Sequence, residues 1–124
     1  MDAVQMSGKE KLLLAALEQT QEGIALVDLK GTVLYTNRAF ADMHGFRSDE
    51  LLGENLSVFH LSEHMPQVES ANRQVLETGS FTGEIWHLRR DGTVFPTLMH
   101  STLIRDGNGK AVGMLGTLFD MTDM

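Results

Sequence analysis

The stretch GIALVDLKGTVLYTNRAF, residues 23–40, decides the fold of this chain. It contains two apolar runs rich in β-forming residues, 24–29 and 33–36, separated by a Lys-Gly pair that is typical of a turn. Asn37 follows directly, and its side-chain oxygen can accept a backbone N–H at the start of a helix over residues 38–44. The stretch therefore predicts a β-hairpin that leads straight into a short helix.

Helical patterns lie on both sides of this stretch. Residues 9–19 carry apolar side chains at helical spacing, which predicts an amphipathic helix before the hairpin. After the hairpin, a serine followed by two acidic residues at 48–50 is typical of the start of a second short helix. A longer helix is expected over residues 62–78, because Pro66 lies in its first turn and Gly79 stands where it would end.

The last third of the chain changes to a period of two, which is typical of strands. Residues 81–90, 93–104 and 111–119 follow this pattern and are joined by Asp-Gly and Asn-Gly turn pairs. Because short connections make successive strands neighbours, the natural closure is one five-stranded antiparallel sheet with the central helices packed on one face. The expected fold class is α+β.

Length and composition restrict the possible functions. A chain of 124 residues and 13.7 kDa is one domain by the usual size of compact domains. Its formal charge of -7 would repel a phosphate backbone, so nucleic acid is not an expected partner. The absence of cysteine excludes disulfides, thiolate metal sites and flavin–cysteinyl adducts. No apolar run approaches the ~20 residues that span a membrane, so we expect a cytoplasmic protein without direct membrane contact.

The order of the predicted elements resembles the PAS domain family. Several stretches look like that family's sequence features: its first hairpin and core helix (residues 23–40), its second short helix (45–53), its third strand and following hairpin (83–92, then Phe95-Pro96), and its closing motif (120–122). The resemblance covers about residues 17–122, which is nearly the whole chain. It implies a PAS fold over residues 21–122, preceded by a helix and linker at 1–20 and followed by the start of an output linker at 123–124.

The resemblance also implies a class of function. PAS domains are sensory or interaction modules, usually parts of larger signalling proteins such as the histidine kinases of two-component systems. Catalytic activity is therefore not expected in this chain, and any kinase activity would lie in an output domain of the same polypeptide. Asp120 and Thr122 of the closing motif are expected to pass the signal to that domain.

Strand alternation separates the two faces of the predicted sheet, although periodicity alone does not say which face meets the helices. By resemblance to ligand-binding PAS domains, one set is assigned to a pocket between sheet and helices. Its members, with three residues from the helical region, are Phe40, Met43, Val68, Ile85, His87, Thr97, Met99, Ser101, Met114, Gly116 and Leu118. Small polar residues and flexible methionines leave room for a small ligand, while a core packed by those methionines is the alternative.

The opposite face would expose a large apolar patch made of Trp86, Leu98, Leu115 and Phe119. The N-terminal helix, through Leu13 and Leu17, is the expected cover of this face. The helix could come from the same chain or from a second copy, and the family resemblance favours a homodimer.

The histidines are the side chains most able to hold a metal or a haem. The segment 60–64 matches the H-x-x-E-H pattern of one class of zinc peptidases, but Pro66 places the helix start near Ser62 and leaves His60 outside the helix. We therefore expect no metal site, and two solvated histidines near a helix start. Some PAS sensors hold haem through a histidine on the long helix, and residues 68–76 contain none. Haem and redox-type flavin remain distant alternatives, and the cofactor is left open.

Three further residues have more than one interpretation each. His87 could orient a polar ligand group, serve as the base of a small enzyme, or be a hydrogen-bonded core histidine. Arg89 and Arg90 could bind a phosphate, but a solvated pair bonded to Asp49 or Glu50 is preferred. The main rival to a ligand sensor is a dimerisation module with a filled core.

Overall fold

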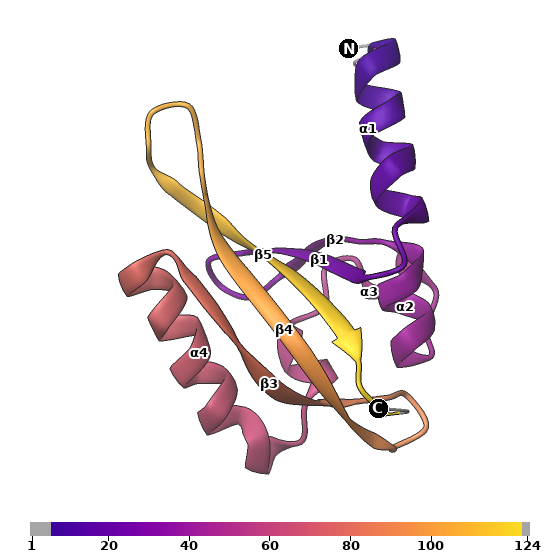
Figure 1. Ribbon diagram of the computed structural model, residues 1–124, viewed down its shortest axis with the longest axis vertical. Coiled ribbons are helices and arrows are strands. Elements are labelled where there is room, and N and C mark those ends of the chain that lie inside the picture. Colours follow the sequence, from indigo (N-terminus) through magenta and orange to yellow (C-terminus); the bar gives the residue numbers. More distant parts are fainter. Residues whose placement is uncertain (1–5, 123–124) are drawn as a thin grey trace.

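A computed structural model describes residues 6–122. Residues 1–5 of the expected N-terminal segment, and the expected linker start at 123–124, lie outside the described residues. Five strands form one antiparallel sheet in the order β2-β1-β5-β4-β3 (Figure 1). Their bounds are β1 Gly23–Asp28, β2 Val33–Thr36, β3 Ser80–Leu88, β4 Val94–Arg105 and β5 Ala111–Asp120. The α+β class and the five-stranded antiparallel sheet are confirmed.

The segments between β2 and β3 cover one face of the sheet (Figure 1). They comprise α2 (Arg38–His44), α3 (Ser48–Leu51), the 3-10 turns η1 (Leu56–Phe59) and η2 (Ser62–His64), and α4 (Met65–Thr78). The expected helix over 62–78 is thus a 3-10 turn followed by an α-helix. Pro66 lies in the first turn of α4, where its missing N–H breaks no hydrogen bond.

Asn37 joins the hairpin to α2. Its Oδ1 accepts hydrogen bonds from the backbone N–H groups of Phe40 at 3.0 Å and Ile24 at 2.9 Å. Its Nδ2 donates to three carbonyls of the segment before β1, those of Leu17, Thr20 and Glu22. The predicted helix cap is confirmed, and the same side chain also fixes the entry of the chain into the sheet.

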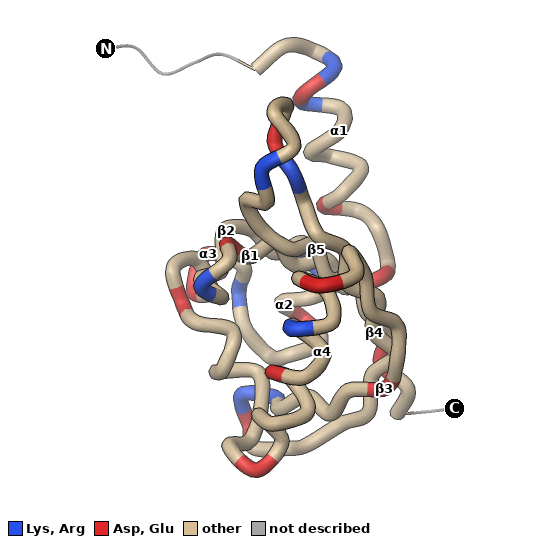
Figure 2. The backbone as a smooth tube through the Cα atoms, turned by 90° about the vertical axis from the view of Figure 1, so that its left-hand side faces the viewer, with Lys and Arg blue, Asp and Glu red and all other residues tan. Residues whose placement is uncertain are grey.

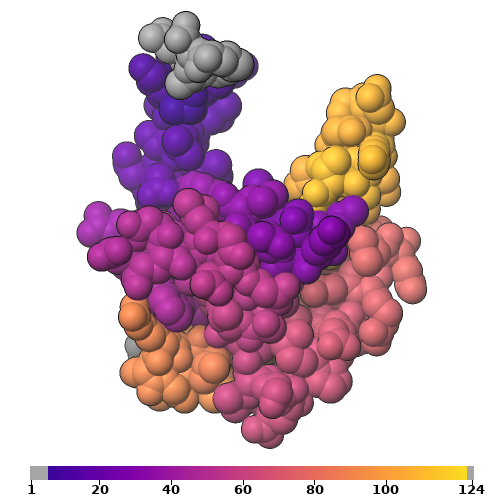
Figure 3. All heavy atoms as spheres, turned by 180° about the vertical axis from the view of Figure 1, so that it is seen from behind, coloured from indigo at the N-terminus to yellow at the C-terminus, as the bar shows by residue number. Residues whose placement is uncertain are grey.

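The N-terminal helix α1 (Gly8–Gln19) does not lie where the sequence predicts it. It projects from the body, separately from the tip of the β4–β5 hairpin (Figures 1 and 3). None of its residues is buried, and Leu13 and Leu17 are exposed. Within the chain, the expected packing of this helix on the outer sheet face is therefore wrong. The reason is that Asn37 and the short linker hold the end of α1 beside α2, away from that face.

Burial identifies the two sheet faces. Ile85, His87, Thr97 and Leu118 are buried under the helices, on the face that the family resemblance assigns to them. The opposite face is partly open: Trp86 is 45%, Leu98 41% and Phe119 46% exposed, and Leu115 is half-buried.

The structure shows where the charged residues lie and whether any helix could cross a membrane. The basic and acidic residues are interspersed along the backbone (Figure 2). Within residues 6–122, none of the helices is both long enough and apolar enough to cross a membrane.

Candidate functional site

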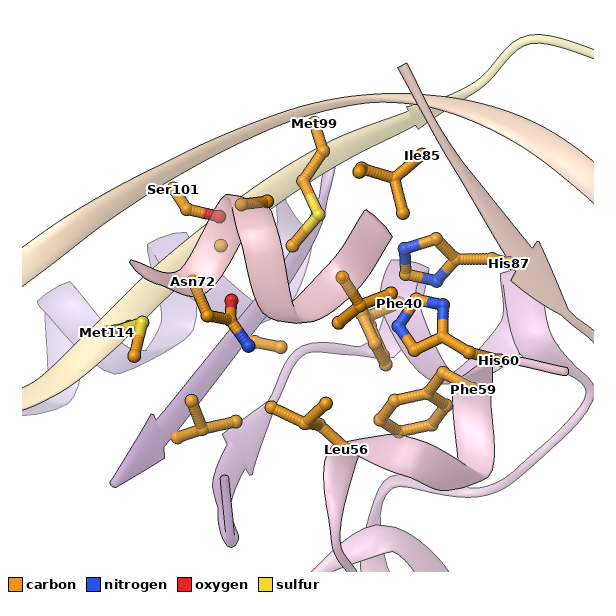
Figure 4. A pocket seen from close by; sticks show the side chains of 15 residues that line it. Phe40, Leu56, Phe59, His60, Asn72, Ile85, His87, Met99, Ser101 and Met114 are labelled. Atoms are coloured by element: carbon orange, nitrogen blue, oxygen red, sulfur yellow. The ribbon is translucent and has the colours of Figure 1, made fainter. Parts of the chain in front are cut away.

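A cavity of about 60 Å³ lies between the sheet and the helices (Figure 4). Eight of the eleven predicted pocket residues line it: Phe40, Val68, Ile85, His87, Met99, Ser101, Met114 and Gly116. Gly116 leaves room for Met99, since a Cβ at this position would lie 3.1 Å from Cε of Met99 and the methionine would have to shift. The strand alternation thus identifies most of one wall.

Three predicted pocket residues do not line the cavity. Thr97 is fully buried and its Oγ1 donates to the Ile85 carbonyl at 2.7 Å. Leu118 belongs to the packed core, and Met43 packs against that core near Gly23. These three residues were predicted because they share a face or helix with lining residues, but the cavity occupies only part of the face that the helices cover.

Seven lining residues were not predicted. They are Ala25, Val27, Leu56, Phe59, His60, Ala71 and Asn72. Alternation along β1 could have identified Ala25 and Val27, and the apolar stripe of α4 could have identified Ala71. No periodic signal exists for Leu56, Phe59 and His60, since they lie on or beside the short turn η1, whose direction depends on tertiary packing.

Three histidines form a buried cluster at one end of the cavity. His44 Nδ1 bonds the Phe40 carbonyl at 2.7 Å, and His44 Nε2 bonds His87 Nδ1 at 2.8 Å. The His60 ring lies 4.5 Å from that of His87, centroid to centroid, and its Nδ1 bonds the Trp86 carbonyl at 2.9 Å. The expectation of a solvated His60 is wrong, because η1 turns its ring inward under the sheet.

Burial favours the neutral form of all three rings. It lowers the pKa of His44 to about 4, despite the hydrogen bond to the Phe40 carbonyl, which acts in the opposite direction. Burial also lowers the pKa of His60 and holds that of His87 well below its usual value. The cluster is therefore uncharged at neutral pH.

Arg89 connects the neighbourhood of the cavity to the end of the last strand. Its guanidinium donates to the Met43 carbonyl at the end of α2 and to Asp120 at 2.8 Å, and it bonds Thr122 at 3.2 Å. The same group lies 3.8 Å above the ring of Phe95. Partial burial would raise the pKa of Asp120, but hydrogen bonds from Thr122 and Arg89 outweigh it and keep that pKa below its ordinary value.

The expected pairing with Asp49 or Glu50 is correct for Arg90 and wrong for Arg89. Arg90 forms the predicted ion pair with Glu50 at 3.0 Å, on the surface. Arg89 has different partners, because the chain turns after β3 and directs its side chain across the sheet end.

The cavity is too small for haem or flavin. A drug-sized ligand occupies a pocket of roughly 300–1,000 Å³, several times the volume present here. The three-ring flavin and the porphyrin of haem do not fit it. Within residues 6–122 no three histidine, aspartate or glutamate side chains come together as a metal site. The residues present fit a small ligand.

Comparison with known proteins identifies the family. The family model described as PAS domain matches residues 21–123, so the chain belongs to the PAS domain family. The chain is 28% identical over 111 residues to sporulation kinase C of Bacillus subtilis. The aligned stretch covers 86% of this chain and 25% of that kinase. It is 25% identical over 118 residues to blue-light-activated histidine kinase 1 of Erythrobacter litoralis, covering 92% of this chain and 33% of that protein.

Solved structures share the fold. The PAS domain of a Colwellia psychrerythraea protein superimposes with a TM-score of 0.86 at 24% identity, covering 92% of this chain and 98% of that one. The structure of an RNA-binding light-oxygen-voltage receptor superimposes with a TM-score of 0.82 at 25% identity. The match covers 98% of this chain and 37% of the receptor chain. The chain is thus a single sensory PAS domain related to kinases and light receptors. The chain spans about a quarter of the length of sporulation kinase C and a third of that of the blue-light-activated kinase.

Proposed function

We propose that this chain is the sensory domain of a cytoplasmic signal-transduction protein, a histidine kinase or similar regulator, that binds a small ligand between sheet and helices. The observation that carries the proposal is the cavity, which is apolar over most of its wall and has histidine side chains at one end. A packed core would close such a space, because protein interiors leave few voids larger than a water molecule.

The signal would leave the cavity through α2 and Arg89. His87 lines the cavity and bonds His44, and His44 bonds back to Phe40 on the same helix. The carbonyl of Met43, one residue before His44, accepts a hydrogen bond from Arg89, and Arg89 also donates to the Asp120 carboxylate. If these contacts have two arrangements, a ligand that binds one arrangement more tightly than the other would favour it and so shift the C-terminal junction at Asp120 and Thr122.

The output is proposed to act through a homodimer. The outer sheet face leaves Trp86, Leu98 and Phe119 partly exposed, and Leu98 and Phe119 are cross-strand neighbours. α1 exposes its leucines without burying any residue. A second copy that placed its α1 on this face would cover both apolar surfaces at once.

Native mass spectrometry and an absorption spectrum of the purified chain test the ligand. We expect these measurements to reveal a bound small molecule. If the purified chain carries none, we expect an NMR fragment screen to find a small molecule that shifts the amide signals of the cavity residues. Ser101→Leu fills the cavity and should abolish this binding. Thr102→Leu, on the next residue and the opposite face, is the matched control and should leave it intact. A wild-type chain that neither carries nor binds any small molecule would contradict the proposal.

The exposed outer face also supports a second function, a ligand-free dimerisation module. This function predicts a dimer whose cavity signals respond to no added small molecule. The same two measurements, mass and fragment screen, therefore separate the two functions.

A further inference from the structure

One ring nitrogen in the cavity wall lacks a partner. Nε2 of His87 is buried and makes no hydrogen bond with any residue that the structure describes, and His87 itself is only 2% exposed. Its ring lines the cavity beside His60 (Figure 4). A buried polar atom without a partner is costly, so this nitrogen calls for an explanation.

The hydrogen bonds of the cluster determine what this nitrogen can do. The Phe40 carbonyl only accepts, so Nδ1 of His44 carries the proton that it shares at 2.7 Å. In a neutral ring Nε2 of His44 is then bare and accepts, so Nδ1 of His87 must be the donor across the 2.8 Å contact. Nε2 of His87 is therefore an unprotonated acceptor with a free lone pair.

The same argument applies to His60. Its Nδ1 donates to the Trp86 carbonyl at 2.9 Å, which leaves its own Nε2 without a proton. Two neutral imidazoles that each have an acceptor nitrogen thus stand side by side at one end of the cavity. This end attracts hydrogen-bond donors and offers none from its ring nitrogens.

The rest of the wall defines the body of the ligand. The lining has no Asp, Glu, Lys or Arg, so nothing in it would compensate a charged ligand. Phe40, Ile85 and Met99 contribute apolar surface along the middle of the cavity (Figure 4). The volume of about 60 Å³ corresponds to a few water molecules.

We propose that the cavity selects a small, uncharged, mostly apolar molecule that donates an N–H or O–H hydrogen bond to Nε2 of His87. This assignment rests on the proposed ligand-binding function and adds to it the polarity of the ligand. A donor satisfies the orphan nitrogen, whereas an isosteric molecule without a donor leaves it unpaired.

Pyrrole and furan provide a matched pair of probes. They have the same ring size and shape, but pyrrole has an N–H donor and furan has none. In titrations of the full chain followed by NMR, we expect pyrrole to bind roughly tenfold more tightly than furan. A long-range ¹H–¹⁵N spectrum of the histidine rings should show the His87 Nε2 signal moving with pyrrole and not with furan. Furan binding as tightly as pyrrole, or an unmoved Nε2 signal, would overturn the assignment.

Two variants test the residue. His87→Asn places an amide N–H near the position of Nδ1, so it retains a donor for His44 and removes the acceptor at Nε2. It should abolish the preference for pyrrole, while Ser101→Ala, at the other end of the cavity, should retain it (Figure 4). A preference that survives in a folded His87→Asn protein contradicts the assignment.

The outcomes also separate this inference from the proposed function. If other small molecules bind the cavity but donors hold no advantage, the sensory function stands and the donor assignment fails. If the cavity binds no molecule of any kind, both fail.

Discussion

At the scale of single residues, Asn37 shows how one side chain can hold several segments together. It is fully buried and makes five hydrogen bonds, two as acceptor and three as donor, to α2, β1 and the segment before β1. The backbone N–H groups of Ile24 and Phe40 that it satisfies are buried, and an unpaired buried N–H is costly. The residue therefore contributes more than a surface helix cap.

Replacing Asn37 by Ala should destabilise the fold by about 3 kcal/mol or more, because it removes a helix cap and strands several buried groups. Asn55→Ala is the matched control: Asn55 is exposed, and its side chain makes two hydrogen bonds around η1. The control should lose about 1 kcal/mol. Urea unfolding of the two variants measures the difference, and equal losses would contradict this account of Asn37.

The buried histidines predict a pH dependence of stability. The folded pKa of His44 is about 4, below the 6.5 of an unfolded histidine, so between these values the unfolded chain binds more protons. The contribution of His44 is complete above pH 6.5 and is lost as the pH falls toward 4. At pH 5.5 the loss from His44 is about 1 kcal/mol relative to pH 7.5. His60 and His87, whose pKa values are also lowered by burial, add to it.

Urea midpoints at pH 7.5 and 5.5 measure this dependence. His44→Asn should reduce the difference between the two midpoints. His100→Asn, on the exposed outer face, should leave it unchanged. A wild-type stability that does not change over this interval would show that the three rings are not held neutral.

At the scale of elements, Arg89 joins three that are distant in sequence. Its bonds reach the end of α2 and the end of β5 from the turn that follows β3. The ion pair with Asp120 is partly buried and is reinforced by the Phe95 ring below the guanidinium. We expect this contact to couple the movements of α2 and β5.

Arg89→Ala should cost about 1–2 kcal/mol and, more distinctively, speed amide hydrogen exchange at the ends of α2 and β5. Arg90→Ala removes the surface ion pair with Glu50 and should cost at most about 0.5 kcal/mol, with no change at β5. Exchange measured by mass spectrometry distinguishes the two. Unchanged exchange at the end of β5 in Arg89→Ala would argue against the coupling.

At the scale of the whole molecule, the open question is what covers the outer sheet face. The proposed dimer predicts that sedimentation of the full chain gives twice the monomer mass. Leu98→Lys with Phe119→Lys should give a folded monomer, because two charges on cross-strand neighbours cannot be buried without partners. Leu29→Lys, an equally exposed leucine in the turn after β1, is the control and should remain dimeric. A monomeric wild-type chain would contradict the dimer.

The local pattern of the sequence determined the elements and separated the two sheet faces, and the family resemblance then selected the face that contains most of one cavity wall. The caps at Asn37 and Gly45, the proline in the first turn of α4 and the period of two in the last third are all local signals, read from neighbours in the chain. The composition of the sequence also determined that no cysteinyl adduct can form, since the chain contains no cysteine.

Tertiary structure alone decided the chemistry of the site and the position of α1. His44, His60 and His87 come from three separate segments, and no spacing in the sequence brings their rings together. The direction of the Arg89 side chain, the inward turn of His60 and the projection of α1 likewise depend on contacts between distant residues. Periodicity identifies which face a side chain is on, whereas the partner that it meets depends on how the elements pack.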